Sequence, residues 1–128
     1  MANNKFRGLG IALVTPFAKD ESIDFAALDR LVEYQIKSGA DFLCIMGTTA
    51  ETPTLSADEK ALLKQHLVER VAGRVPLLMG CGGNNTSEIV RALQTEDFTG
   101  IDGILSVCPY YNKPSQEGLY QHFKAIDG

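Results

Sequence analysis

Four short runs of apolar residues recur along the chain at intervals of roughly 30 residues, the length of one βα unit. The runs are Gly10–Val14, Phe42–Met46, Val75–Met79 and Gly103–Val107. They are continuous rather than alternating, which is typical of strands that are buried on both faces, as in a parallel sheet. The pattern therefore predicts four parallel strands.

Each run is followed by a segment in which apolar residues return with helical spacing, so the sequence predicts four helices. Their apolar positions are Leu28, Leu31, Val32 and Ile36; Leu63, Leu67 and Val71; Ile89, Val90 and Leu93; and Leu119, Tyr120, Phe123 and Ile126. We expect capping residues to begin these helices and glycines to end the first two. The expected caps are Asp24, the Ser56–Glu59 capping box, Asn85 or Thr86, and the segment Pro114–Glu117, with Gly39 and Gly73 as ends.

Strict alternation of strand and helix predicts an α/β fold, either a doubly wound sheet or a (β/α)8 TIM barrel. A closed barrel usually takes about 250 residues. The 128 residues hold four βα units and stop in the fourth helix, at Asp127–Gly128. The pattern alone does not separate the two architectures.

Composition and charge exclude several classes of protein. Twelve Lys and Arg against sixteen Asp and Glu leave a net charge of −4, which does not favour a nucleic-acid partner. No run approaches the roughly 20 apolar residues of a membrane span, and the N-terminus lacks the apolar core of a signal peptide. We therefore expect a cytoplasmic protein without a membrane partner.

The cysteines and histidines suggest no metal site. Cys44, Cys81 and Cys108 are far apart and follow no zinc or disulfide pattern, so we interpret them as small buried hydrophobic residues. His66 and His122 lie within predicted helices, and we expect them on solvated faces. The sequence thus predicts neither a metal nor another cofactor.

In both architectures, chemistry collects in the loops that follow the strands. The segment Thr15–Phe17 ends the first strand and fits a plain strand stop as well as a site. Gly47–Glu51 combines small residues with two hydroxyl groups, and adjacent N–H groups in such a turn can hold a carboxylate or phosphate. A short turn without a ligand fits that segment equally well.

The loops after the third and fourth strands each allow more than one interpretation. Gly80–Asn85 resembles a dinucleotide fingerprint, but the last position is Asn85, and a glycine-rich turn beside a helix cap explains it better. The loop Cys108–Pro114 carries two tyrosines between two prolines. These tyrosines fit either proton-transfer groups or residues of an interface. Lys113 stands in this loop, without the apolar surroundings that activate a Schiff-base amine.

Together, three segments resemble the dihydrodipicolinate synthase family, which belongs with N-acetylneuraminate lyase among the pyruvate-dependent class I aldolases. They are Ala12–Phe17, Gly47–Leu55 and Pro109–Phe123, in the order and spacing of that family. The resemblance covers the whole chain but only the N-terminal half of such an enzyme. It implies that residues 1–128 are the first four βα units of a single (β/α)8 catalytic domain.

The resemblance also implies a reaction. A lysine forms an imine with pyruvate, and the derived enamine attacks aspartate semialdehyde to give 4-hydroxy-tetrahydrodipicolinate on the route to lysine and diaminopimelate. Thr48 and Thr49 then hold the pyruvate carboxylate, and Thr48 and Tyr111 belong to a proton relay. Tyr111 reaches the neighbouring subunit, which implies a homo-oligomer, a dimer or a tetramer.

Three features depart from the family pattern. Ala50 stands where glycine is usual, and alanine would be strained there only if the backbone needs a positive φ. Asn84, Glu88 and Tyr110 match an allosteric lysine site, but Ala57 and Lys60 replace histidines that accompany strong inhibition. A cation at Lys60 repels a lysine ligand, so we expect weak or absent feedback. The imine lysine, the third relay tyrosine and an aldehyde-binding arginine match no position in residues 1–128.

Two function classes consequently remain. In the first, the chain is the N-terminal half of a dihydrodipicolinate synthase or of a related pyruvate aldolase such as N-acetylneuraminate lyase, and is inactive alone. In the second, it is a non-catalytic half-barrel that acts as an assembly module. Open strand edges invite pairing with another chain, so we expect such a half-barrel to dimerise, to bind a missing C-terminal half or to aggregate.

Overall fold

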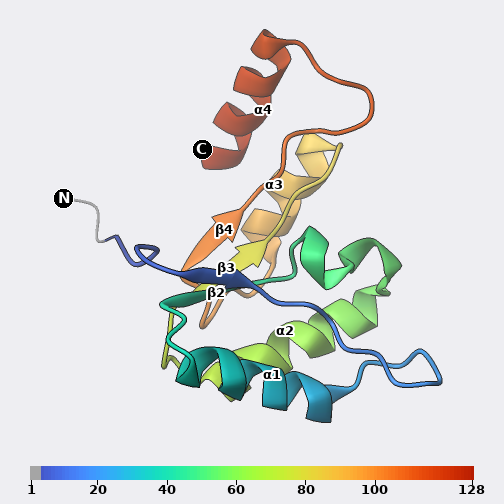
Figure 1. The fold of residues 1–128 in the computed structure, drawn as a ribbon. Coiled ribbons are helices and arrows are strands. Elements are labelled where there is room, and N and C mark those ends of the chain that lie inside the picture. Colours follow the sequence, from blue (N-terminus) through green and yellow to red (C-terminus); the bar gives the residue numbers. More distant parts are fainter. Residues whose placement is uncertain (1–3) are drawn as a thin grey trace.

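The computed structural model describes residues 4–128 and contains the four strands and four helices that the sequence predicts (Figure 1). The strands are β1 (Gly10–Ala12), β2 (Phe42–Ile45), β3 (Leu77–Gly80) and β4 (Gly103–Leu105). The helices are α1 (Phe25–Lys37), α2 (Ala57–Val71), α3 (Thr86–Thr95) and α4 (Gln116–Asp127), and two short 3-10 turns, η1 (Thr48–Ala50) and η2 (Thr52–Thr54), follow β2. Strand β3 begins later than expected, directly after Pro76.

The order of the strands in the sheet decides between the two architectures. The strands lie in the order β1-β2-β3-β4, and all three neighbouring pairs are parallel. In a doubly wound sheet the order of the strands reverses at a switch point, whereas here the order runs from β1 to β4 without a reversal. The connection from one parallel strand through a helix to the next strand is almost always right-handed. A strand order without a reversal therefore places the helices on one face of the sheet, and the other face becomes the interior of a barrel.

The outward face of the sheet carries the main hydrophobic core. One set of alternate strand residues is buried against α1 and α2. The strand residues are Leu13, Leu43, Ile45, Leu77 and Met79, and the helix residues are Leu28, Val32, Leu63, Leu67 and Val71. These are the helix positions that the 3.6-residue period predicts for α1 and α2, so packing of the first two units follows directly from the pattern.

The inward face combines glycines with large side chains from the N-terminal segment and β2. The Phe6 and Phe42 rings meet edge to face with centroids 5.3 Å apart. A Cβ at Gly10 would overlap the Phe42 ring, and one at Gly103 would lie 2.7 Å from the Phe6 ring. Glycine is therefore required at both positions because aromatic rings occupy the space of a side chain.

The predicted caps begin the helices. Asp24 accepts a hydrogen bond from the Ala27 amide at 2.8 Å, and both bonds of the Ser56–Glu59 capping box are present. Asn85, rather than Thr86, caps α3, and Ser115 caps α4. These side chains satisfy N–H groups that lack partners in the first helical turn.

The end of α2 differs from the expectation that Gly73 stops it. The helix ends at Val71, and Ala72 takes the left-handed conformation with φ 51° while donating its amide to the Val68 carbonyl at 3.0 Å. Gly73 follows with φ 70°. The turn therefore needs two consecutive left-handed residues, and an alanine occupies the first.

Both histidines depart from the expectation of solvated faces. The His66 Nε2 lies 2.7 Å from the Asp29 Oδ1, and its ring packs against Phe25 with centroids 4.6 Å apart and an interplanar angle of 48°. His122 is buried, with its Nδ1 2.7 Å from the Thr86 Oγ1. The expectation was wrong because each histidine joins two helices, α1 to α2 and α3 to α4.

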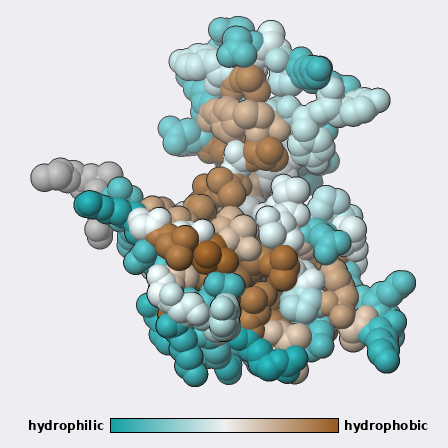
Figure 2. Space-filling model, in the orientation of Figure 1, coloured by the Kyte–Doolittle hydropathy of each residue, from teal (hydrophilic) through white to brown (hydrophobic). Residues whose placement is uncertain are grey.

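Helix α4 packs mainly against α3 and stands away from the sheet (Figure 1). Hydrophobic side chains are visible across the middle of the molecule and on the α4 lobe (Figure 2). Among the described residues, no helix is long and apolar enough to cross a membrane.

Candidate active site at the carboxyl edge of the sheet

The loops that follow the four strands lie at the edge toward which the strand arrows point in Figure 1. The turn after β2 is the most ordered of them by its hydrogen bonds. The Ala50 amide donates to the Gly47 carbonyl at 3.1 Å, and the Glu51 amide donates to the Thr48 carbonyl at 3.0 Å. These two bonds close η1 directly after an extended Gly47.

The start of η1 presents two unsatisfied donors. The first amides of a helical turn have no acceptor within the turn. In residues 4–128, no backbone carbonyl outside the helices accepts from the Thr48 or Thr49 amide, and both threonines are exposed. The turn can therefore hold a small carboxylate with two N–H groups, without a positively charged side chain.

A buried hydroxyl group anchors this turn from the first strand. Thr15 is only 4% exposed, and its Oγ1 donates to the Ala50 carbonyl at 2.7 Å. The bond spans 35 residues and joins the end of β1 to the end of η1. The sequence fits a strand stop and a site residue equally well at Thr15. In the structure, Thr15 stabilises the η1 turn through its hydrogen bond to the Ala50 carbonyl.

Backbone conformations around the turn explain why alanine is tolerated at position 50. Ala50 is buried and does not have a positive φ, whereas Met46 and Glu51 on either side have φ values of 57° and 56°. A Cβ at Gly80 would overlap the Met46 carbonyl. The glycine requirement therefore falls on Gly80, where β3 approaches β2, and Ala50 is not strained.

Tyr111 occupies a tight and exposed turn after β4. The Asn112 amide donates to the Tyr110 carbonyl at 2.9 Å, and Tyr111 between them has φ 70°. A three-residue turn of this type is rare and strained for a residue other than glycine. The Tyr111 side chain is 92% exposed, so the loop holds it outward, away from this chain's core.

The predicted site residues do not all meet within one chain. In residues 4–128, no side-chain hydrogen bond joins Thr48 to Tyr111. Asn84 and Tyr110 do meet, because the Asn84 Oδ1 accepts the Tyr110 amide at 2.6 Å. Glu88 lies exposed in the first turn of α3, next to the cap residue Asn85. The tyrosine loop is thus fixed to the loop after β3.

The cysteines differ in their surroundings. Cys44 is buried and Cys81 half-buried, and burial is the main cause that raises the pKa of each thiol. Cys108 is exposed, so the interpretation as a buried hydrophobic residue is wrong there. Within the described part of the chain, no three His, Cys, Asp or Glu side chains are grouped as metal ligands.

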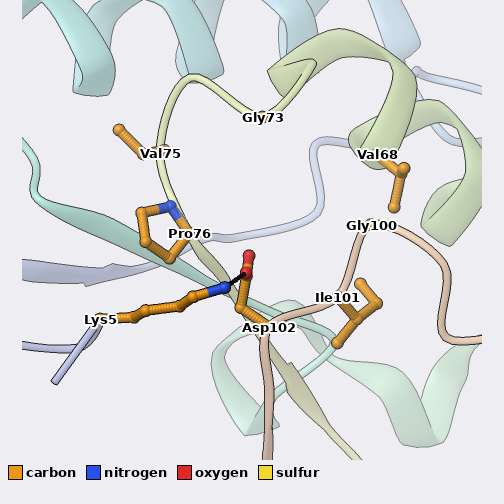
Figure 3. Close-up of a pocket in the computed structure, with 8 residues that line it drawn as sticks. All are labelled: Lys5, Val68, Gly73, Val75, Pro76, Gly100, Ile101 and Asp102. Atoms are coloured by element: carbon orange, nitrogen blue, oxygen red, sulfur yellow. Dashed lines mark hydrogen bonds and ion pairs between the residues drawn. The ribbon is translucent and has the colours of Figure 1, made fainter. Parts of the chain in front are cut away.

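A cavity of about 390 Å³ lies at the opposite edge of the sheet (Figure 3). Lys5 and Asp102 cross it with an ion pair of 2.7 Å, and the second Asp102 oxygen accepts the Leu77 amide at 3.0 Å. The Lys5 hydrogen bond is the largest cause that lowers the pKa of Asp102. The charged groups of this cavity are paired with each other. Such pairing is typical of the stabilising end of a barrel rather than of a reactive site.

Comparison with known families settles the ancestry of this arrangement. The model of the dihydrodipicolinate synthetase family matches residues 5–127. The chain belongs to the dihydrodipicolinate synthetase family. It is 54% identical over 126 residues to the 4-hydroxy-tetrahydrodipicolinate synthase of Phocaeicola vulgatus, covering 98% of this chain and 42% of the relative. The corresponding enzyme of Parabacteroides distasonis is 56% identical over 126 residues, with the same coverage.

Solved structures of the dihydrodipicolinate synthetase family share this fold. Dihydrodipicolinate synthase from Thermotoga maritima superposes with a TM-score of 0.87 at 44% identity, covering 95% of this chain and 41% of that one. The Acinetobacter baumannii enzyme in complex with pyruvate gives a TM-score of 0.87 at 41% identity, covering 94% and 41%. The described residues are therefore the first four βα units of a TIM barrel, and the chain spans about two-fifths of these relatives' length.

Proposed function

We propose that this chain supplies the N-terminal half of a lyase that condenses pyruvate with aspartate semialdehyde to 4-hydroxy-tetrahydrodipicolinate. Family membership and the names of its relatives support the reaction class. The observation that carries the proposal is the η1 turn, whose Thr48 and Thr49 amides are free and which Thr15 fixes at the carboxyl edge of the sheet.

In the proposed reaction, a lysine amine attacks the pyruvate ketone and releases water to form an imine. Loss of a methyl proton gives an enamine, whose carbon bonds to the aldehyde carbon of aspartate semialdehyde while the aldehyde oxygen takes up a proton. The amino group of the bound product then attacks the imine carbon, which closes the ring and releases the lysine amine. The family resemblance assigns this lysine to a later strand, beyond position 128. Lys113 is exposed on a loop with φ 46° and has none of the burial that such an amine requires.

The residues of this chain act on the carboxylate and on protons. The Thr48 and Thr49 amides hold the pyruvate carboxylate, which places the ketone at a fixed distance from the amine. The Thr48 hydroxyl bridges tyrosine hydroxyls, one of them Tyr111 from a neighbouring subunit. A chain of hydroxyls transfers protons without placing a fixed charge beside the enamine.

The setting of the proposed enzyme follows from the same family. It acts in the cytoplasm on the route to lysine and diaminopimelate, as a homotetramer. The Tyr111 side chain is 92% exposed, so it is free to reach a neighbouring subunit, as the family resemblance implies. A dihydrodipicolinate synthase variant described as monomeric also shares the fold, with a TM-score of 0.88.

Regulation by lysine is expected to be weak in the proposed enzyme. Asn84, Glu88 and Tyr110 form the inferred lysine site, and the Asn84 bond to the Tyr110 amide brings two of them together. Lys60 and Ala57, on the first turns of α2, stand where strongly inhibited members have histidines. An exposed ammonium group at Lys60 repels a cationic effector.

A chimera tests the proposal directly. Residues 1–128 replace the matching segment of the Phocaeicola vulgatus synthase, with which they share 54% identity. We expect the chimera to condense pyruvate with aspartate semialdehyde, and Tyr111→Phe to lower kcat by roughly 100-fold or more. Tyr34→Phe, on the exposed face of α1, is the matched control. A folded chimera without activity would contradict the proposal.

The isolated chain gives a second test. It is incubated with pyruvate and borohydride, which reduces any imine to a stable adduct, and its intact mass is then measured. We expect no adduct on the chain and one adduct on the chimera. A specific adduct on the isolated chain would show that the reactive amine lies within residues 1–128.

A further inference from the structure

The turn that carries Tyr111 holds two residues in a backbone conformation that is costly for a residue with a Cβ. Tyr111 has φ 70° and Lys113 has φ 46°. Backbone strain of this kind persists only where the surrounding structure fixes it, and it is concentrated at functional sites. The direction of the Tyr111 side chain therefore depends on the contacts that hold its turn in place.

Asn84 supplies one of these contacts from the loop after β3. Its side-chain Oδ1 accepts a hydrogen bond from the Tyr110 amide at 2.6 Å, although the two residues are 26 positions apart. The Tyr110 carbonyl accepts the Asn112 amide at 2.9 Å, and this second bond closes the turn around Tyr111. Both backbone groups of Tyr110 are thus bonded, one within the turn and one to Asn84.

The start of α3 fixes Asn84 and also holds the helix that follows the tyrosine turn. Asn85 caps α3, and the Oγ1 of Thr86 lies 2.7 Å from the Nδ1 of His122, a buried residue of α4. The segment that connects β4 to α4 is therefore bonded to the start of α3 on both sides of the turn (Figure 1). Because both bonds come from three consecutive positions, the start of α3 determines where the tyrosine turn lies.

We propose that Asn84 is a positioning residue for Tyr111, whose strained turn it holds through the Tyr110 amide. This inference rests on the proposed function, in which the Tyr111 hydroxyl transfers protons. A proton-transfer group must lie within about 2.6–3.2 Å of its partner. Misplacement by about 1 Å can lower a rate by about 100-fold. Asn84 bonds to backbone and not to substrate, so it acts through Tyr111.

The proposed role of Asn84 is separate from the binding of pyruvate. The Thr48 and Thr49 amides belong to η1, which Thr15 fixes from the end of β1. In residues 4–128, no hydrogen bond joins η1 to positions 110–113. Loss of the Asn84 bond should therefore displace the tyrosine and leave the two amides in place, so that the rate falls while the affinity for pyruvate does not.

The active chimera with the Phocaeicola vulgatus synthase tests this role, in assays without lysine because Asn84 also belongs to the inferred lysine site. Asn84→Ala removes the acceptor, so we expect kcat to fall roughly 10-fold or more while the pyruvate dissociation constant, measured by calorimetry, stays within about two-fold. Asn84→Asp keeps an oxygen that accepts the Tyr110 amide and should retain kcat within about three-fold. Asn85→Ala, the matched control, removes a helix cap and should lower the melting temperature while kcat stays within about two-fold.

A double variant shows whether Asn84 acts through Tyr111. In a chimera that already carries Tyr111→Phe, Asn84→Ala should lower kcat by less than about three-fold further, because the hydroxyl that it positions is gone. Circular dichroism confirms folding, and Asn84→Leu replaces Asn84→Ala if that variant does not fold. An unchanged kcat in folded Asn84→Ala, or an equal loss with and without the Tyr111 hydroxyl, would overturn the positioning role alone. A folded but inactive parent chimera, or full activity in Tyr111→Phe, would refute the proposed function and this inference with it.

Discussion

At the scale of single residues, two buried polar side chains in the described part of the chain connect elements that are distant in sequence. Thr15 and His122 are each 4% exposed. Thr15 fixes the η1 turn through the Ala50 carbonyl, and His122 joins α4 to α3 through Thr86. A buried polar group contributes to stability only while its partner is present, so both positions are sensitive to substitution.

Substitution of Thr15 tests its bond to the turn. Thr15→Val keeps the shape of the side chain but leaves the Ala50 carbonyl without its donor, so we expect a loss of about 1–3 kcal/mol in the free energy of unfolding. Thr15→Ser keeps the hydroxyl and loses one methyl group, which costs about 1 kcal/mol or less. Urea unfolding of the three proteins measures both values. Equal losses for valine and serine would show that packing, rather than the hydrogen bond, matters at Thr15.

The sequence alone could not assign these two residues. Periodicity reports which positions face the core, but it does not report which polar side chain finds a partner 35 residues away. The partner of Thr15 is a backbone carbonyl, which leaves no mark in the sequence. His122 was expected on a solvated face because the contact between α3 and α4 is tertiary.

At the scale of elements, local sequence signals predict where helices begin better than where they end. Side chains such as Ser56 and Glu59 bond to amides within the same turn, so the cap is visible in the sequence. The end of α2 depends on the left-handed conformation of Ala72, a residue whose type favours continuing a helix. Tertiary packing of Val71 and the following chain overrides that preference.

Ala72→Gly is expected to stabilise the protein. The left-handed conformation costs an L-residue with a Cβ about 1–2 kcal/mol, and glycine avoids this cost while losing more chain entropy on folding. The expected net gain is roughly 0.5–1 kcal/mol in thermal or urea unfolding. Ala61→Gly, in the exposed interior of the same helix, should instead cost about 1 kcal/mol. A loss at both positions would contradict the strained end of α2.

At the scale of the whole molecule, the N-terminal segment holds the bottom of the sheet together. Lys5 pairs with Asp102, and Phe6 packs over Gly103 and Phe42. The alternation of strands and helices was predictable from the apolar runs, whereas the strand order that separates a barrel from a doubly wound sheet was not. The N-terminal segment was not, because a single aromatic residue and a single lysine in an irregular segment have no periodic signal.

The Asp102 pair should make stability depend on pH. Its folded pKa lies below the ordinary value of 3.8, so it contributes stability above that value and loses it as pH falls through the folded pKa. Asp102→Asn should cost about 1 kcal/mol at neutral pH, because the partly exposed ion pair is screened by solvent. The difference between the two proteins should vanish under strongly acidic conditions.

Unfolding curves from neutral to acidic pH measure this difference. Lys5→Met, which removes the other partner, should reduce stability over the same pH range and should add little to Asp102→Asn in the double variant. A difference that stays constant down to low pH would show that Asp102 acts through packing rather than through its charge.

The packing of Phe6 on Gly103 also bears on how the chain folds during synthesis. The ring emerges from the ribosome early, and the glycine that accommodates it follows almost a hundred residues later. Until then Phe6 has Phe42 but not β4 as a neighbour. The packing at this end of the sheet is therefore completed only when β4 has been translated. A nascent chain that stops short of β4 leaves one face of the Phe6 ring without its packing partner.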